Sequence, residues 1–221
     1  MRWSEVRFVG FDVETSGPDP LTAEIITASV GDQDWLLRPS SSIPERATAI
    51  HGITTEEAMS RGMEHAEGLA AIRDAIGQVW DDGGALCVFN ATYDCTLLDR
   101  ELRRYGLDGF EIRGVVIDPY VIDKQADRYR RGSRRLVDVA RHHGVELSAE
   151  EAHGARADAR AAAQLGRLLA GYLPDVREAN DWQARWHSEQ KSSYAEWLVS
   201  QGREQQAMQV RSERGWPLRH M

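Results

Sequence analysis

Residues 6–17 read VRFVGFDVETSG, and this stretch decides the fold more than any other part of the chain. The run from Val6 to Val13 is apolar enough to form a strand that enters a core, and turn residues follow it. Asp12 and Glu14 lie two positions apart at its end, so their side chains leave the same face of a sheet. Most acidic pairs at strand ends are solvated, but open α/β sheets place their ligands at this edge.

Strand-like and helix-like segments follow in a recognisable order. Further strands are expected at 25–30, 35–37, 85–89 and 115–117, and helices at 45–61 with a break near Gly52, 69–80, 93–105, 136–143 and 156–169. The strands begin as a meander and then alternate with helices. This order predicts an α/β fold with a mixed central sheet flanked by helices.

The composition limits the class of protein. The chain has 221 residues, 42% of them hydrophobic, which suits one globular domain with a short C-terminal appendage. Its formal net charge of -8 argues against a basic nucleic-acid clamp, although metal-binding carboxylates can make a nuclease acidic. Cys87 and Cys95 are expected to be buried free thiols. The sequence has neither a signal peptide nor a membrane span, so a cytoplasmic protein is expected.

Two further clusters of titratable residues accompany the first pair. Asp94 follows the apolar run at 85–89, where a short turn leads into a helix; alone, it is more often an ordinary first-turn aspartate. His153 and Asp158 are five residues apart, which is about 140° of rotation on a helix, so they cannot share a helical face. Asp158 belongs to the apolar helix at 156–169, and His153 is therefore expected in the loop before it.

Three of these segments, in this order, resemble the DEDD superfamily of 3′→5′ exonucleases, in the variant whose fifth residue is histidine. They are FDVETSG at 11–17, NATYD at 90–94 and HGARADA at 153–159. A further segment, HGIT at 51–54, looks like one common in the branch with the proofreading subunit of bacterial DNA polymerase III. The resemblance predicts an exonuclease domain at 1–173 and leaves 174–221 as a Trp-rich helical extension.

The resemblance implies an RNase H-like fold and hydrolysis of phosphodiester bonds from a 3′ end with two Mg²⁺ or Mn²⁺ ions. Asp12, Glu14, Asp94 and Asp158 would correspond to the metal-ligand carboxylates. His153 would correspond to the general base that deprotonates the attacking water. Because a base needs neutral imidazole, activity is expected to decline below about pH 6.5.

Four other residues are expected to contact the substrate. Thr15 and Ser16 follow the first acidic pair, and their backbone is expected to meet the terminal nucleotide. Asn90 begins the second motif. His51 either lines the nucleotide groove or holds the loop before Thr54, whose capping-box pattern favours the structural role.

The leading functional hypothesis is an exonuclease that acts on single-stranded DNA 3′ ends, in proofreading or repair. The same motif residues suit a 3′→5′ exoribonuclease, because the discrimination rests on how the 2′-hydroxyl is received. A non-catalytic scaffold that binds nucleic-acid ends is an alternative of another class. A polymerase partner, or a second copy of the chain, would be expected to bind through the C-terminal extension.

Two other patterns are open to more than one interpretation. Five arginines fall within 128–135, where they either contact a phosphate backbone or form a solvated loop. Asp118, just before Pro119, is expected to cap a turn or helix rather than to bind metal.

The extension is expected to form a helix at 181–201. Its aromatic residues Trp182, Trp186, Tyr194 and Trp197 fall within one broad arc of that helix. Three roles are open for this arc: it packs on its own domain, which is favoured, or it docks a partner protein, or, least favoured, it stacks nucleic-acid bases. The segment WPL at 216–218 is expected to fold back onto the domain.

Overall fold

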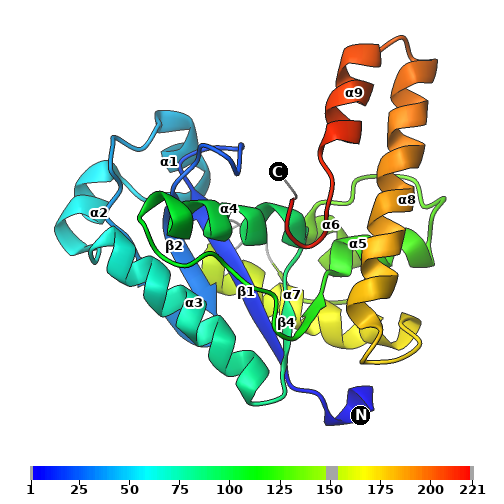
Figure 1. Ribbon diagram of the computed structural model, residues 1–221, viewed down its shortest axis with the longest axis horizontal. Coiled ribbons are helices and arrows are strands. Elements are labelled where there is room, and N and C mark those ends of the chain that lie inside the picture. The colour runs from blue at the N-terminus through cyan, green and yellow to red at the C-terminus, as the bar shows by residue number, and fades with distance from the viewer. Residues whose placement is uncertain (1, 148–153, 220–221) are drawn as a thin grey trace.

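The computed structural model describes residues 2–147 and 154–219, and Figure 1 shows how their helices surround a central sheet. Within these residues, five strands form one sheet in the order β3-β2-β1-β4-β5. The strands are β1 (Phe8–Thr15), β2 (Ile25–Val30), β3 (Gln33–Leu36), β4 (Ala85–Cys87) and β5 (Val115–Ile117). β2 pairs with β1 and β3 in antiparallel fashion, whereas β4 runs parallel to β1 and β5. The mixed sheet predicted from the sequence is therefore confirmed.

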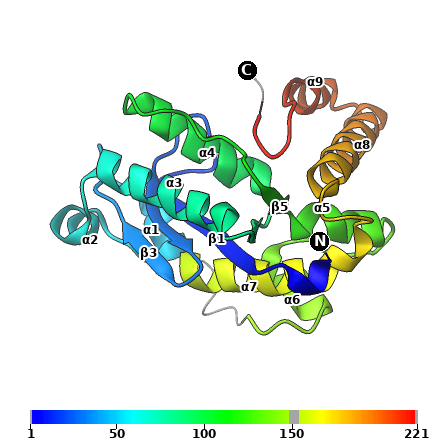
Figure 2. The same ribbon diagram turned by 60° about the horizontal axis from the view of Figure 1, so that its bottom comes forward.

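Helices cover both faces of this sheet. They are α1 (Glu45–His51), α2 (Thr55–Arg61), α3 (His65–Asp81), α4 (Ala91–Arg104), α5 (Pro119–Ala126), α6 (Leu136–His142), α7 (Ala155–Leu169), α8 (Ala179–Ser200) and α9 (Glu204–Ser212), with short 3-10 turns at Trp3–Glu5 and Ala170–Tyr172. Figure 2 shows α3 and α4 on one face and α7 on the other. No helix in the described part of the chain is both long and apolar enough to cross a membrane.

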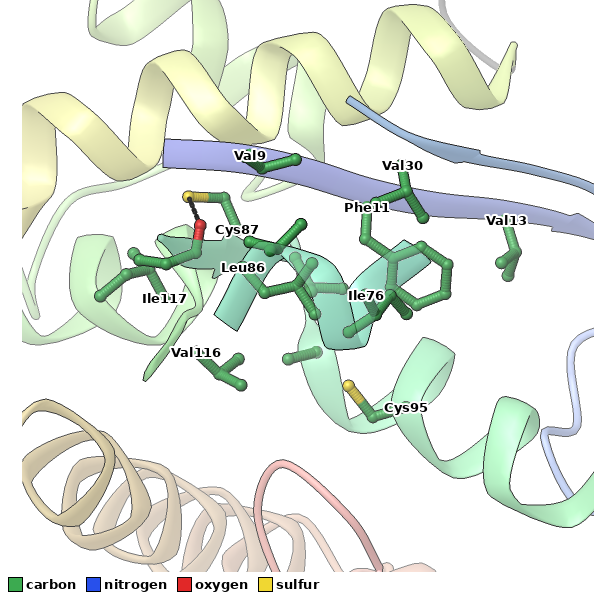
Figure 3. Close-up of a cluster of buried hydrophobic side chains, with 14 of the residues drawn as sticks. Val9, Phe11, Val13, Val30, Ile76, Leu86, Cys87, Cys95, Val116 and Ile117 are labelled. Atoms are coloured by element: carbon green, nitrogen blue, oxygen red, sulfur yellow. Dashed lines mark hydrogen bonds between the residues drawn. The ribbon is translucent and has the colours of Figure 1, made fainter. Parts of the chain in front are cut away.

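Alternation along β1 separates the core from the polar face. Figure 3 shows Phe11 from β1 close to Ile76 of α3, Leu86 of β4 and Cys95 of α4. All four side chains are fully buried. Gly10, one position before Phe11, faces the other way, towards α7. The acidic side chains of β1 share this second face, because they alternate with the apolar ones.

Glycine brings α7 unusually close to the sheet. A Cβ atom at Gly10 would lie 1.8 Å from the carbonyl oxygen of Ala159 in α7. A Cβ atom at Gly166, further along α7, would lie 2.6 Å from Cys87 Sγ in β4. Larger side chains would force the helix away at both points. The close approach places the first turn of α7 directly over the end of β1.

The structure adds two helices to those expected. The α5 helix begins at Pro119, and Asp118 caps it by accepting from the backbone N–H groups of Tyr120 and Val121. Capping by Asp118 was predicted, but the helix that follows was not. The α9 helix lies beyond Gly202 and packs beside α8. Elsewhere the differences are in the bounds; β1, for example, extends to Thr15 instead of ending at Val13.

The C-terminal extension covers the edge of the sheet. In α8, the amide of Asn180 accepts from Val116 N and donates to Gly114 O, both at 2.9 Å. Gln183 donates to Val116 O at 2.8 Å and accepts from Asp118 N at 2.7 Å. These side chains satisfy the backbone groups that an edge strand otherwise exposes. The division at 173/174 stays a prediction, and the segment beyond it packs directly on β5.

The aromatic arc of α8 divides into two parts. Trp186 is buried and packs with Trp182 at the edge of the core. Tyr194 and Trp197, two turns further on, stack on each other with ring centroids 5.7 Å apart and remain about half exposed. The predicted packing on the domain therefore holds for the first part of the helix. Trp216 is also buried, so the segment at 216–218 does fold back as expected.

Candidate active site

The fold brings three carboxylates into one cluster at the end of β1. One oxygen from each of Asp12, Glu14 and Asp158 lies within 4.8 Å of the other two. The first two come from β1, and Asp158 comes from the first turn of α7. Asp94, in the first turn of α4, is buried and close enough for its charge to affect Asp12. Four acidic residues from three distant segments of the chain thus share one end of the sheet.

A single buried side chain fixes the start of α4, and with it Asp94. Asp118 Oδ1 accepts from Asn90 N at 2.9 Å, and Oδ2 accepts from Ala91 N at 3.0 Å. Asn90 has a left-handed backbone, with φ at 65°, which is uncommon for a residue with a side chain. Trp216 Nε1 donates to Asp118 Oδ2 at 3.2 Å. The C-terminal segment therefore supports the same turn that leads into the helix of Asp94.

The carboxylates repel one another. Burial is the main reason that the pKa of Asp12 is well above its usual value, and the neighbouring carboxylates raise it further. Burial and then Asp158 raise the pKa of Glu14 to about 7. Burial also raises the pKa of Asp94, against hydrogen bonds that favour its charged form. Partly buried acids at this spacing favour a bound cation, which would offset their repulsion.

The donor set of this cluster fits hard divalent cations. Every candidate ligand atom is a carboxylate oxygen, as Mg²⁺ and Mn²⁺ prefer. The three oxygens of Asp12, Glu14 and Asp158 are close enough for one ion to contact them all. The structure therefore agrees with a metal site here, while the assignment of individual ligands stays a prediction.

Two pockets adjoin the cluster. The first has a volume of about 660 Å³, and its lining includes Asp12, Asp94 and Asp158 together with Tyr120, Arg134 and Arg135. The second, of about 620 Å³, is lined by Glu14, His51, Ile53, Arg156 and Arg160, among others. The acidic cluster thus adjoins two cavities whose linings also contain arginines, a combination suited to an anionic ligand that carries bound metal.

Tyr120 was not identified as a site residue from the sequence. It lies in the first turn of α5, the helix that was not predicted. The signal was present in Asp118 and Pro119, because a capping aspartate followed by proline typically starts a helix. Tyr93, inside the quoted second motif, was also given no role. Its hydroxyl lies 2.9 Å from Thr15 Oγ1 and donates to Gly17 O at 2.6 Å.

The residues expected to contact substrate lie around the cluster. Thr15 and Ser16 use their hydroxyl groups internally: Thr15 Oγ1 donates to Gly17 O, and Ser16 Oγ accepts from Glu24 N. His51 lines the pocket beside Glu14, and burial lowers the pKa of its ring. Its Nδ1 accepts from Ile53 N at 3.1 Å, so it also holds the loop. Asn90 is exposed and lines the other pocket. Their substrate contacts stay predictions.

The predicted general base cannot be placed in this geometry. His153 lies outside the residues that the structure describes, which resume at Gly154, just before α7. Its role therefore stays a prediction.

The arginine-rich stretch at 128–135 is largely bound to acids of the protein itself. Buried Asp123 in α5 accepts from Arg130 and from Arg134, each at 2.6 Å, and His143 Nε2 lies 2.8 Å from its other oxygen. Arg128 pairs with Glu189 at 3.3 Å, and Arg135 with Asp138 at 3.1 Å. The predicted phosphate contacts could therefore involve only those guanidinium groups of this stretch that remain accessible in the first pocket after these ion pairs have formed.

Known proteins are similar in sequence to most of this chain. The RNase T family model, described as exonuclease, matches residues 9–165. The uncharacterized exonuclease CP81 of Escherichia phage 186 is 32% identical over 174 residues, which cover 72% of this chain and 86% of the phage protein.

Solved structures share the fold at lower identity. Exonuclease I of E. coli in complex with a dT13 oligonucleotide gives a TM-score of 0.61 at 20% identity, over 77% of this chain and 42% of that one. Exonuclease I from Methylocaldum szegediense gives a TM-score of 0.60 at 20% identity, over 82% of this chain and 44% of that one. The chain thus spans less than half the length of these exonucleases. The family match and the phage relative together show that this protein is an exonuclease of the RNase T family, within the DEDD superfamily predicted from its motifs.

Proposed function

We propose that this exonuclease removes nucleotides from the 3′ end of single-stranded DNA. The observation that carries the proposal is the cluster of Asp12, Glu14 and Asp158 oxygens within 4.8 Å, with Asp94 beside it and a pocket on either side. Two divalent ions bound there would stabilise the charge that develops on the attacking and leaving oxygens of the phosphate. The pockets leave room on both sides of the cluster for the nucleotides next to a scissile bond.

The protein's own residues have separate roles in this reaction. The four carboxylates would hold the ions, and α4 and α7 position two of the four, Asp94 and Asp158, beside β1. Arg135, whose side chain is 78% exposed, lines the same pocket as the acids, where its charge would attract a phosphate. His153 accepts a proton from the attacking water as the general base. This last role gives the decline in activity below about pH 6.5.

DNA is favoured over RNA because of the solved relatives. Exonuclease I of E. coli was crystallised with dT13 and with dA16 oligonucleotides. The same fold in this chain supports a single DNA strand as the substrate class. Proofreading or repair is the process in which such an activity would serve, with a polymerase or a second copy of the chain as partner.

The test uses 5′-labelled DNA and RNA of one sequence, with Mg²⁺, Mn²⁺ or EDTA. Asp158→Asn removes one carboxylate charge at nearly constant size, and Asp74→Asn makes the same change outside the cluster and both pockets. We expect a metal-dependent ladder that shortens from the 3′ end, slowed by roughly a thousandfold in Asp158→Asn and unchanged in the control. Faster hydrolysis of RNA would replace the DNA substrate. No ladder from folded protein on either substrate would refute the activity.

A further inference from the structure

The α8–α9 hairpin and the segment after it form a basic pocket separate from the carboxylate cluster. Figure 1 shows α8 and α9 side by side, with the chain returning from α9 towards α4. The pocket has a volume of about 690 Å³ and is lined by Ala184, His187, Ser188, Lys191, Ser192, Val210, Arg211, Glu213, Arg214, Gly215 and Trp216. Its lining contains three permanent cations and a single acid.

The single acid already has its partners. Glu213 Oε2 lies 2.6 Å from Lys191 Nζ, and its Oε1 lies 3.4 Å from Arg219 Nη1. Arg211 and Arg214 are exposed, and within the described residues their guanidinium groups have neither a hydrogen bond nor an ion pair. Two positive charges in this pocket therefore have no acidic partner among the residues that the structure describes.

A short line of side chains, Tyr120, Lys124 and His187, connects this pocket with the pocket beside the carboxylates. Lys124 Nζ lies 4.8 Å from the ring centroid of Tyr120, which lines the pocket beside the carboxylates. Gln190 in α8 donates to Val121 O at 2.9 Å, so α8 is fixed against α5 along this line. His187 lies near both Lys124 and Lys191, whose charges add to burial in lowering its pKa to about 4.

The surplus of positive charge in this pocket contrasts with the charge of the whole protein. With a net charge of -8, the molecule as a whole repels polyanions. Two arginines that no acid in the described part of the chain neutralises, both in the lining of one pocket, can attract an anionic ligand, and the phosphodiester backbone carries one negative charge per nucleotide. Ser188 and Ser192 add hydroxyl donors to the same lining. A strand running from the carboxylates past Tyr120 and Lys124 would reach this pocket.

We propose that the basic pocket between α8 and α9 binds the phosphate backbone of the substrate strand, several nucleotides on the 5′ side of the scissile bond. The inference rests on the proposed function and adds a second binding site to it. Its consequence is a preference for length: a strand that reaches the hairpin binds more tightly than one confined to the pockets beside the carboxylates.

The test compares a trinucleotide with a 20-mer of single-stranded DNA. The variant Arg211→Glu with Arg214→Glu reverses the two uncompensated charges. The control, Arg167→Glu with Arg177→Glu, makes the same change of charge at two exposed arginines outside every pocket described here. For the first variant we expect the KM for the 20-mer to rise tenfold or more, with kcat and trinucleotide hydrolysis unchanged. The control should match the wild type on both substrates.

A binding measurement separates this proposal from the enzymatic one. Fluorescence anisotropy of a labelled 20-mer in EDTA does not depend on turnover. There the variant should weaken binding, and the slope of log K against log salt should decrease in magnitude by roughly 1.4 for two lost contacts. Arg211→Gln with Arg214→Gln should give a smaller change in the same direction. Equal effects in variant and control, or none in either, would refute the basic pocket, whereas absent hydrolysis by wild type with normal binding would refute only the activity.

Discussion

The molecule has two arginine-rich regions, and they differ in what surrounds the charges. In the loop at 128–135, Arg130 and Arg134 end on buried Asp123. On the hairpin, Arg211 and Arg214 have no such partner in the described part of the chain. The loop is the denser cluster in sequence, but most of its arginines are paired with acids, whereas both arginines on the hairpin side are free to meet a ligand. Density of basic residues is therefore a poor guide to phosphate binding unless the acids packed against them are known.

The two regions also obtain their order from different contacts. The loop is held by charge-assisted hydrogen bonds to one buried carboxylate. The hairpin is held at its base by neutral amides of α8 on β5 and by Trp216 on Asp118. Substitutions that remove one kind of contact should affect one region and spare the other.

The largest effect is expected for Asp123→Ala. It leaves Arg130 and Arg134, both largely buried, without their common acceptor. Breaking a buried ion pair from one side typically costs about 3–5 kcal/mol. Urea denaturation should show this loss. Asp138→Ala, which removes the more exposed partner of Arg135 and Arg141, should change stability by less than about 1 kcal/mol. Equal losses would mean that the loop is not held by Asp123.

Trp216→Phe tests how the segment after α9 is attached to Asp118. The change keeps a large ring but removes the N–H donor to Asp118. Burial raises the pKa of Asp118, the hydrogen bond from Trp216 lowers it, and the net value is about 6. A hydrogen bond to a charged group is worth about 1.5 kcal/mol or more. Trp3→Phe is the matched control, since its N–H donates to the neutral carbonyl of Leu173 at 3.3 Å. The loss of unfolding free energy should be larger at 216 than at 3.

His187 gives the hairpin side a sensitivity to acid. Burial, then Lys191, Lys124 and Arg219, lower its pKa from 6.5 to about 4. The folded protein therefore resists a proton that the unfolded chain accepts, so stability is retained above pH 6.5 and lost as the pH falls towards 4. For a ring that is not fully enclosed we expect on the order of 1 kcal/mol. His187→Gln should flatten the curve of unfolding free energy against pH between 6.5 and 4; a curve unchanged from wild type would contradict this.

The smallest effect is expected for Arg128→Ala. Its ion pair with Glu189 joins the loop to α8 at the surface, with both side chains about half exposed. Such pairs contribute roughly 0–1 kcal/mol. We expect unfolding free energy to change by less than about 0.5 kcal/mol, with a still smaller effect in 1 M salt. A loss above 2 kcal/mol would show that the loop and the hairpin are coupled more strongly than their contacts indicate.

Part of the site follows directly from local pattern. Asp12 and Glu14 alternate with Phe11 and Val13 along one strand, so a period of two was enough to place both acids on one face. Asp158 follows from the helical spacing of its apolar neighbours. The motifs also fixed the family, because their residue types and order are specific in combination.

Other features depend on contacts between distant segments. The α5 helix was missed because its eight residues give too short a period to recognise, although Asp118 and Pro119 marked its start. Tyr120 was missed with it. The pairing of Arg130 and Arg134 with Asp123 was missed as well, because nothing in the sequence shows that Asp123 is buried between them.

The sequence by itself determined the mixed α/β sheet, the membership of the exonuclease family and the group of acids expected at the end of β1. These rest on periodicity and on residue types at fixed spacing, which are local properties. The tertiary structure alone decided how close α7 comes to β1, through Gly10 and Ala159, and which positive charges are neutralised. Both depend on packing between segments far apart in the chain, where distance and burial, rather than residue type, set the strength of an interaction.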